Sequence, residues 1–139
     1  HQINAGDIIV LRYEGPRGGP GLPDVFKVMG YLVALDLHEK CAVITDGKVS
    51  GFAKGPFVCQ VTPEAAVGGT IALVEEGDRI HMDLNNRRLD LLVDEKTLEQ
   101  RRKVWKPKPC RAKTGLLTLY AKLALPATEG AGISLKIDE

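Results

Sequence analysis

The sequence predicts a mixed α/β domain in which a barrel-like or curled mixed β-sheet is flanked by helices. Short apolar runs bounded by Gly, Pro or Asn predict six or more strands, and stretches with helical spacing predict three or four helices. The strands and helices do not alternate regularly, which disfavours a simple series of parallel β-α-β units. A chain of 139 residues can bury the core of one domain and is too short for two ordinary domains.

The first part of the chain predicts two strands separated by a glycine-rich loop and a helix. Residues 6–13, GDIIVLRY, are rich in β-branched residues and predict a strand. Residues 14–24, EGPRGGPGLPD, interleave glycine with proline, which neither a helix nor a strand tolerates, so they predict a shaped loop. Apolar residues then recur at helical spacing from Asp24 to about Leu37, and CAVIT, residues 41–45, predicts a buried strand.

The middle of the chain predicts three short elements. Residues 57–61, FVCQV, predict a strand. Thr62 suits the N-cap and Pro63 the first position of a short helix, which ends at the glycine pair 68–69. Residues 70–74, TIALV, predict another strand.

The last part predicts a hairpin, two helices and a tail. RIHMDL and RLDLLV alternate on either side of a turn whose paired Asn residues tolerate positive φ, which is typical of a β-hairpin. Asp94 is expected to cap a helix that runs to about Trp105 and ends before the prolines of KPKPC. Residues 114–125 predict an amphipathic helix, and residues 126–139 are expected to form a loose tail.

The charge and composition of the chain exclude several classes of function. The formal net charge is +1, which argues against general binding to nucleic acid or to acidic membranes. Residues 94–113 hold eight Lys or Arg against three Asp or Glu, which we interpret as a solvated helix and linker. The polar start, HQINAG, and the lack of any long apolar run predict no signal peptide and no membrane span. We therefore expect a location in the cytoplasm, or in an organelle matrix in a eukaryote, and the missing initial Met is typical of a fragment.

The three cysteines do not have the spacing of a metal site. Their odd number suits a reducing compartment. Cys41 and Cys59 lie in apolar strand-like runs and are interpreted as free buried thiols.

The familiar catalytic motifs do not match this chain. GKVSG differs from the G-x-S-x-G nucleophile elbow because Ser50 sits one position late, and none of the three histidines is tied to it by sequence. The glycine-rich loop lacks the G-K-[ST] ending of a P-loop, and no zinc spacing is found. A serine hydrolase and a nucleotide-binding site are therefore disfavoured.

Two loops remain as candidates for a site. EGPRGGPGLPD follows the first predicted strand, and TDGKVSG follows the strand at residues 41–45. If these strands are neighbours, both loops converge at one end of the sheet. The groups brought together there would be glycine N–H groups, three acids and a serine: Glu14, Asp24, Asp46 and Ser50. Loop N–H groups suit anions such as carboxylates, and acidic side chains suit Mg²⁺. A serine hydroxyl is a useful base only where a cation or oriented dipoles stabilise its alkoxide; a small polar residue in a tight turn is the alternative for Ser50.

Four motifs in order resemble the C-terminal domain of the dihydroxy-acid dehydratase family, which also includes 6-phosphogluconate dehydratase and several sugar-acid dehydratases. They are RYEGPRGGPGLPD, VITDGKVSG, QVTPEAAVGGTIALVEEGD and NRRLDLLV. The resemblance runs from about Gly6 to Tyr120, and four ordered motifs with matching spacing are far more specific than any one of them.

The resemblance implies a fold, a reaction and a set of site residues. The fold is a swivelling β/β/α domain, and the reaction is dehydration of 2,3-dihydroxy or sugar acids to 2-keto acids, as in branched-chain amino acid biosynthesis. The enzymes use Mg²⁺ and an iron–sulfur cluster, whose ligands lie mostly in a larger N-terminal domain. By position, Ser50 corresponds to the base at C2 and Asp24 to a metal-binding carboxylate, while Gly51 and Phe52 would contact the substrate. The expected partners are the hydroxy acid, the N-terminal domain and other copies of the full enzyme, but neither nucleic acid nor membrane.

The chain departs from the family pattern at several positions. Asp24 stands where Glu is usual, so its carboxylate is one methylene shorter. Phe52 replaces a small or hydroxyl-bearing residue and would narrow the substrate pocket, and Gln60 replaces a His. These departures motivate an alternative hypothesis, in which the domain is a non-catalytic binding or regulatory module, or the small subunit of a split dehydratase. In either case the isolated domain is expected to be inactive.

Overall fold

The fold is a mixed α/β domain with two separate sheets. It is known from a computed structural model, which describes residues 3–133. The described strands do not close into a barrel, so the barrel-like part of the expectation is not confirmed. In chain order the elements are β1 (Ile8–Leu11), α1 (Phe26–Ala34), β2 (Ala42–Thr45), β3 (Phe57–Val58), the 3₁₀ turns η1 (Ala65–Val67) and η2 (Thr70–Leu73), β4 (Ile80–Asp83), β5 (Arg88–Leu91), α2 (Glu95–Val104), α3 (Leu116–Leu123) and the 3₁₀ turn η3 (Ala127–Glu129).

The larger sheet is parallel and has the order β1-β2-β3. Ile8 is paired with Ala42 and Leu11 with Thr45, so the carboxyl ends of β1 and β2 lie at the same edge. Every residue of β2 is buried, which explains why its sequence is a continuous apolar run instead of an alternating one.

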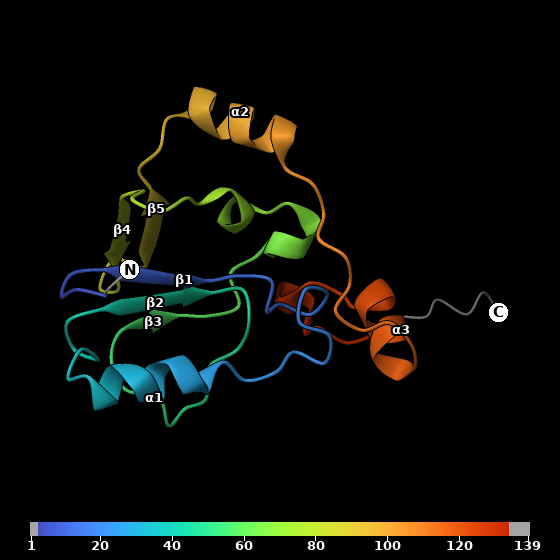
Figure 1. Ribbon diagram of the computed structural model, residues 1–139, viewed down its shortest axis with the longest axis horizontal. Coiled ribbons are helices and arrows are strands. Elements are labelled where there is room, and N and C mark those ends of the chain that lie inside the picture. Colours follow the sequence, from blue (N-terminus) through green and yellow to red (C-terminus); the bar gives the residue numbers. More distant parts are fainter. Residues whose placement is uncertain (1–2, 134–139) are drawn as a thin grey trace.

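Helix α1 covers one face of this sheet (Figure 1). Met29 and Leu32, three residues apart and hence on one side of the helix, pack against Cys41 and Val43 in one core cluster. The predicted helix at residues 24–37 is thus confirmed, with shorter bounds.

The other face of the sheet is covered by η1, η2 and the β4–β5 hairpin (Figure 1). Tyr13 and Ile44 form the second core cluster with Ala65, Ile71 and Ala72. The hairpin is antiparallel, as its sequence predicts.

Two sequence-based predictions in the middle of the chain are wrong. Residues 70–73 form a 3₁₀ turn instead of a strand, and the guanidinium of Arg12 donates to the carbonyls of Ala72 and Val74, both at 2.7 Å. A short apolar run, buried here from Ile71 to Leu73, has no periodicity that could separate the two possibilities. The helix expected from Thr62 begins only at Ala65, because the Ala65 N–H is held by a buried carboxylate described below.

Helix α2 lies on the side of the molecule opposite to α1 (Figure 1). The Asp94 side chain accepts a hydrogen bond from the Thr97 N–H at 2.9 Å, so the predicted N-cap is confirmed. Arg101 holds the helix to the turn before β4, because its guanidinium donates to both carboxylate oxygens of Asp78, at 2.6 and 3.0 Å, and to the carbonyl of Leu73.

The Asp78–Arg101 pair predicts a pH-dependent part of the stability. The hydrogen bond from Arg101 lowers the pKa of Asp78 from its ordinary value. A carboxyl group with a lowered folded-state pKa stabilises the fold above its ordinary pKa, about 3.9 for Asp, and loses that effect as the pH falls through the lowered value. Asp78→Asn should therefore lower the Tm at pH 7, and the difference from the parent chain should vanish in strong acid. Thermal unfolding from pH 7 to pH 2 tests this, with Glu39→Gln as an exposed control; a pH-independent difference would contradict it.

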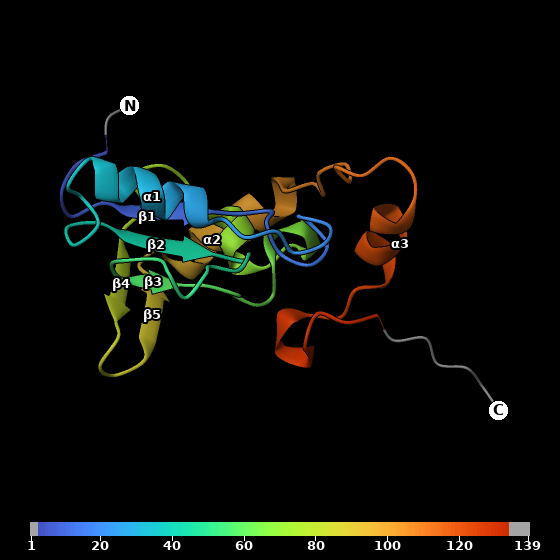
Figure 2. The same ribbon diagram turned by 90° about the horizontal axis from the view of Figure 1, so that it is seen from below.

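Helix α3 and the segment after it lie beyond the carboxyl ends of β1 and β2 (Figures 1 and 2). The segment turns back on the helix, since Ala124 pairs with Ile133 and the Tyr120 hydroxyl donates to the carbonyl of Ala131 at 2.6 Å. Within the expected tail, the residues that follow η3 are thus tied back to α3, and residues 134–139 lie outside the described part.

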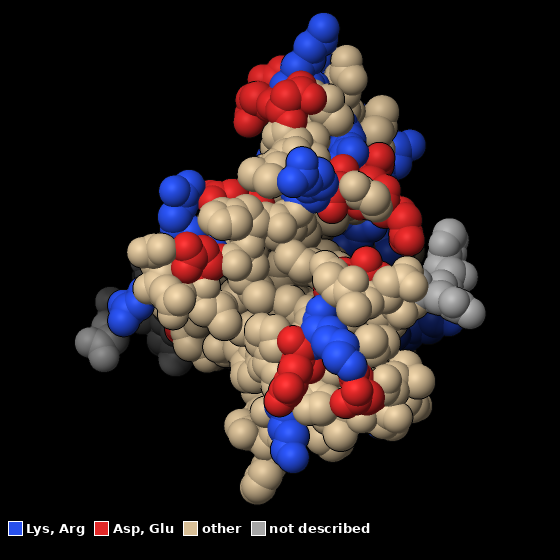
Figure 3. Space-filling model, turned by 90° about the vertical axis from the view of Figure 1, so that its left-hand side faces the viewer, with Lys and Arg blue, Asp and Glu red and all other residues tan. Residues whose placement is uncertain are grey.

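Charged residues of both signs are interspersed on the face shown in Figure 3, with an uncharged area between them. The described cysteines are all free, and Cys41 is buried, Cys59 half-buried and Cys110 exposed. Within residues 3–133, no helix has the length and apolarity needed to cross a membrane.

Candidate functional site

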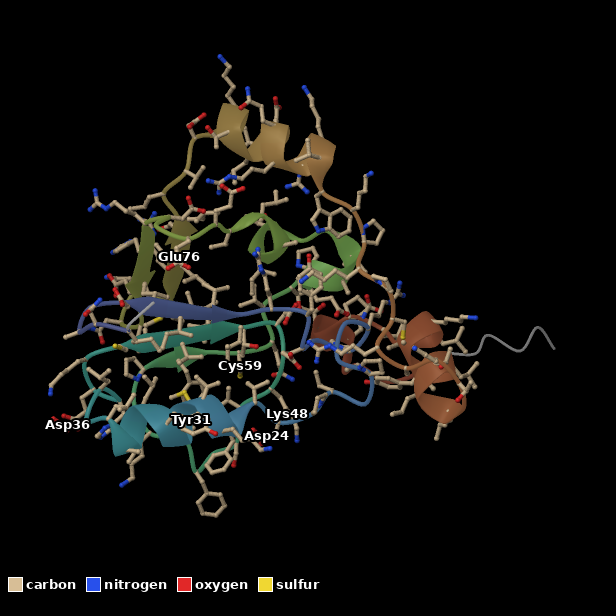
Figure 4. The ribbon with its side chains drawn as sticks, viewed as in Figure 1. Asp24, Tyr31, Asp36, Lys48, Cys59 and Glu76 are labelled. Carbon is tan, nitrogen blue, oxygen red and sulfur yellow. The ribbon has the colours of Figure 1, made fainter. Side chains whose placement is uncertain are left out.

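The two glycine-containing loops meet at the carboxyl edge of the parallel sheet, as the sequence predicts for neighbouring strands. Asp24 pairs with Lys48 in a parallel bridge, and the Val25 N–H donates to the carbonyl of Lys48 at 3.0 Å. Figure 4 shows Asp24 and Lys48 side by side near the N-terminal end of α1. The contact joins the end of the first loop to the middle of the second.

Asp24 and Ser50 lie together at this contact. One carboxylate oxygen of Asp24 accepts hydrogen bonds from the Phe26 N–H at 2.8 Å and from the Ser50 N–H at 3.3 Å. Among the described residues, no hydrogen-bond donor occupies the other oxygen of this exposed carboxylate. The Ser50 hydroxyl accepts a hydrogen bond from the Phe52 N–H at 3.3 Å, and no described histidine is bonded to it.

Gly51 and Phe52 form the exposed tip of the second loop. The side chain of Phe52 is 90% exposed, and a methyl group added at Gly51 would meet nothing within 4 Å. Within this chain the two residues therefore do not enclose a substrate pocket.

Asp46 has a different position from the one the sequence suggests, because it points inward and is 0% exposed. Its carboxylate accepts hydrogen bonds from the N–H groups of Tyr13 at 3.0 Å, Glu14 at 2.9 Å and Ala65 at 2.8 Å. A single buried carboxylate thus joins the end of β1, the end of β2 and the start of η1. It satisfies backbone donors that would otherwise be unpaired, so its role is to hold the loops in place.

Glu64 holds the glycine-rich loop in the same way. Its buried carboxylate accepts hydrogen bonds from the N–H groups of Arg17 and Gly18, both at 2.9 Å. A methyl group added at Gly15 would lie 2.6 Å from this carboxylate, so the loop approaches it more closely than any other residue would allow. Gly15 therefore serves packing against Glu64, whereas Gly18 and Gly19 lie against the backbone of Tyr13 and Glu14.

The linker between α2 and α3 fastens the loop from outside. Arg111 forms a bidentate ion pair with Glu14, with distances of 3.0 and 2.6 Å, and this hydrogen bonding raises the pKa of Arg111. The Trp105 indole N–H donates to the Tyr13 hydroxyl at 3.1 Å. Glu14 is thus engaged in structure, which leaves Asp24 as the open carboxylate of the first loop.

Two cavities flank this region without including its reactive groups. A cavity of about 240 Å³ lies behind the glycine-rich loop, between Pro16, Glu64 and Pro126, and a cleft of about 850 Å³ lies between β1 and the turn before β4. Neither is lined by Asp24 or Ser50, which lie on the open surface. Residues 3–133 contain no cluster of three or more His, Cys, Asp or Glu that could hold a metal ion by itself.

The sequence motifs place Asp24 and Ser50 in adjoining loops, as the structure has them, but they do not identify the buried acids that hold these loops. The roles of Asp46 and Glu64 have a signal only in retrospect: each acid lies beside small or cyclic residues, in TDG and PEA, where the chain turns sharply. The backbone donors that they satisfy are 19 to 47 residues away in sequence, so no local pattern reveals them.

Comparison with known proteins agrees with this architecture. The family model described as dihydroxy-acid/6-phosphogluconate dehydratase C-terminal matches residues 1–131. A dihydroxy-acid dehydratase from Ignicoccus hospitalis is 52% identical over 132 residues, which is 95% of this chain and 24% of that protein. Those from Geobacter sulfurreducens and Pyrobaculum aerophilum are 51% and 50% identical over 130 residues, or 94% of this chain and 24% and 23% of their own lengths.

The chain spans about a quarter of the length of these relatives. The matched region includes both loops, Asp24, Ser50 and the buried acids that hold them. The chain therefore belongs to the dihydroxy-acid/6-phosphogluconate dehydratase C-terminal family.

Proposed function

We propose that this chain is the C-terminal part of a hydro-lyase that dehydrates a 2,3-dihydroxy carboxylic acid, or a related sugar acid, to a 2-keto acid. The observation that carries the proposal is the placement of the exposed Asp24 carboxylate against Ser50 at the edge of the sheet. One group can bind a hard cation and the other can take a proton, and the reaction requires both functions.

Ser50 is the base that removes the proton from C2 of the substrate. An ordinary serine hydroxyl is too weakly acidic for this role, and no histidine among residues 3–133 is bonded to Ser50 to activate it. It needs a cation nearby, which stabilises the alkoxide. The loop can present Ser50 in one orientation because Asp24 accepts its N–H and the hydroxyl accepts the N–H of Phe52.

Asp24 fits a Mg²⁺ site as one ligand among several. Its second oxygen has no described donor, the side chain is exposed, and a carboxylate is a preferred ligand of Mg²⁺. When bound, the cation stabilises the negative charge that develops beside the substrate carboxylate. Because no larger acidic cluster is present in residues 3–133, the other ligands would come from the rest of the enzyme.

The cysteines of this chain do not fit an iron–sulfur cluster. Cys41 is buried beneath α1, Cys110 is exposed in the linker before α3, and Cys59 is half-buried beyond β3. The three do not converge with any other described ligand. A cluster in the complete enzyme would take its ligands elsewhere.

Gly51 and Phe52 contact the substrate only once the site is enclosed. Gly51 leaves space beside Ser50, and the Phe52 ring can cover the apolar part of a hydroxy acid. The exposure of Phe52 also favours one alternative, in which the chain is a separate small subunit that binds to a cluster-containing subunit.

The test is a product assay with the full-length enzyme, reconstituted with its metal and cluster. Incubation with a panel of 2,3-dihydroxy and sugar acids should give a 2-keto acid, observed by NMR as loss of the C2 proton and of the C3 hydroxyl. The 139-residue chain alone should give none. Lack of any keto acid from an enzyme with an intact cluster would overturn the proposal.

The same assay can test Asp24. Asp24→Ala should raise the Mg²⁺ concentration needed for half-maximal activity by at least about tenfold, because a charged ligand is lost. Asp24→Glu, which restores the length usual in the family, should retain Mg²⁺ binding. Equilibrium Mn²⁺ binding followed by electron paramagnetic resonance gives a readout independent of turnover, and unchanged affinity in Asp24→Ala would remove Asp24 from the metal site.

A further inference from the structure

The outward side of α1 is unusually poor in charge for a surface helix. The helix sequence, FKVMGYLVA, holds one charged residue, Lys27. Tyr31 is 68% exposed, the C-capping Leu35 is 62% exposed and Phe26 is 47% exposed. A solvated helix carries charged and polar groups on its outer side, as α2 does with EKTLEQRRKV.

The Ser50 loop adds Phe52 to this surface, and the exposed Lys48 and Lys54 stand on either side of its tip. Val49 and Ala53 pack against the same core cluster as α1, so the tip between them borders the helix. That tip carries Phe52, which is the most exposed large apolar side chain described. We use the name α1 face for the surface formed by Phe26, Gly30, Tyr31, Val33, Leu35 and Phe52.

Within residues 3–133, neither close packing nor a left-handed backbone requires the glycine in the middle of α1. Glycine destabilises a helix interior relative to alanine. Gly30 is not at a turn, its φ is not positive, and a methyl group added there would meet no atom within 4 Å. A residue without a side chain at this position would allow another backbone or side chain to approach the helix closely.

The position of the α1 face relative to the site indicates what covers it. Phe26 follows Asp24 by two residues, and Phe52 follows Ser50 by two. Figure 4 shows Asp24 and Lys48 at the N-terminal end of α1, where Phe26 lies. A body that completes the metal site at Asp24 must approach this end of the helix. The helix is only about 13 Å long, so such a body also reaches Tyr31 and Leu35. Relatives are about four times longer than this chain, which supplies a body of sufficient size.

We propose that the α1 face is the surface on which the rest of the dehydratase docks, and that this docking excludes water from Asp24 and Ser50. The inference rests on the proposed function in one respect, namely that the chain is part of a larger dehydratase. Apolar burial against Tyr31, Leu35 and Phe52 would stabilise the closed arrangement, and Gly30 would receive an inserted side chain.

The first experiment measures access to the α1 face in the full-length enzyme. Tyr31→Cys and, as a control, Leu84→Cys are treated with a maleimide, and labelling is followed by peptide mass spectrometry. Leu84 is 54% exposed in the turn between β4 and β5, and Figure 2 shows this hairpin on the side of the sheet away from α1. We expect labelling at residue 31 to be at least about tenfold slower than at residue 84, because a packed interface excludes the reagent, and equal in denaturant. Equal rates in the native enzyme would overturn the inference.

A dilution series identifies the occupant. Light scattering gives the oligomeric state, and labelling is repeated where the enzyme is monomeric. Protection that persists in the monomer supports docking within one dehydratase. Protection that disappears with dissociation would overturn the inference and assign the α1 face to a second copy.

A second substitution, Gly30→Leu, gives an independent test, because a free face and a covered face predict opposite changes in Tm. Leucine has a higher helix propensity than glycine, so Gly30→Leu should raise or preserve the Tm if the face is free. It should lower the Tm by several degrees if the rest of the enzyme packs closely against position 30. Gln100→Leu, on the exposed side of α2, should not lower the Tm. Maleimide labelling and Tm do not depend on turnover. An active enzyme whose residue 31 is labelled freely would therefore overturn this inference and leave the proposed function intact.

Discussion

Replacing Ser50 by alanine in the full-length enzyme is expected to lower kcat by about 10²–10⁴-fold, the usual contribution of a general base. Among the described residues, the hydroxyl makes a single long hydrogen bond, from the Phe52 N–H at 3.3 Å, so little stability should be lost with it. The loss should therefore appear in kcat, with an unchanged Tm and an intact cluster spectrum. Steady-state kinetics and thermal unfolding on the same preparation measure both.

The controls for Ser50 separate chemistry from loop structure. Thr70→Ala removes another hydroxyl at an exposed position, at the start of η2, and should leave kcat unchanged. The Ser50→Ala enzyme should also fail to exchange the C2 proton of the dihydroxy acid substrate with solvent, because that exchange needs the same base. A variant with near-normal kcat would show that Ser50 is only a small residue in a tight turn.

Replacing Asp46 by alanine is expected to have the largest effect on stability, a loss of about 3–5 kcal/mol. The substitution leaves the N–H groups of Tyr13, Glu14 and Ala65 without their acceptor, and two of these bonds are fully buried. Each unsatisfied buried donor costs about 1–3 kcal/mol. Urea unfolding of the 139-residue chain measures the change, and its only tryptophan, Trp105, is bonded to Tyr13 and reports directly on this region.

Asp46→Asn provides the matched comparison. The amide keeps one acceptor oxygen, which can serve Tyr13 and Ala65, but its NH₂ group then faces the Glu14 N–H. It should therefore destabilise the chain less than alanine does. Glu39→Ala, which removes a carboxylate whose side chain is 84% exposed, should change little. A loss below about 1 kcal/mol in Asp46→Ala would contradict the role assigned to this carboxylate.

Local patterns in the sequence predicted the elements that depend on nearby residues. The N-cap at Asp94 and the hairpin follow from residues within a few positions of each other, and both are confirmed. Residues 70–74 were misassigned because the carbonyls of η2 are satisfied by Arg12, which is about 60 residues away. The choice between a strand and a 3₁₀ turn depends there on a tertiary contact.

The candidate site shows the same division. Motif spacing placed Asp24 and Ser50 in adjoining loops, and the parallel pairing of β1 and β2 brings them together. Loop composition alone does not distinguish Asp46 and Glu14 from Asp24, because a carboxylate in a loop looks the same whether it faces solvent or the backbone; only the family resemblance singles out Asp24. The fold shows how their surroundings differ, since Asp46 is a buried acceptor, Glu14 is ion-paired and Asp24 is exposed. The base role of Ser50 and the metal role of Asp24 stay predictions.

The fastening of the first loop by the end of the chain has a consequence for synthesis on the ribosome. Glu14 pairs with Arg111, which is 97 residues later, and Arg17 donates to the carbonyl of Ala124, which is 107 residues later. Within this domain, the strand that leads into the loop is translated well before the residues that fasten the loop. A nascent chain stalled before residue 111 should therefore hold a formed sheet and an unfastened glycine-rich loop, and the loop should reach its final shape only when nearly the whole domain has been translated.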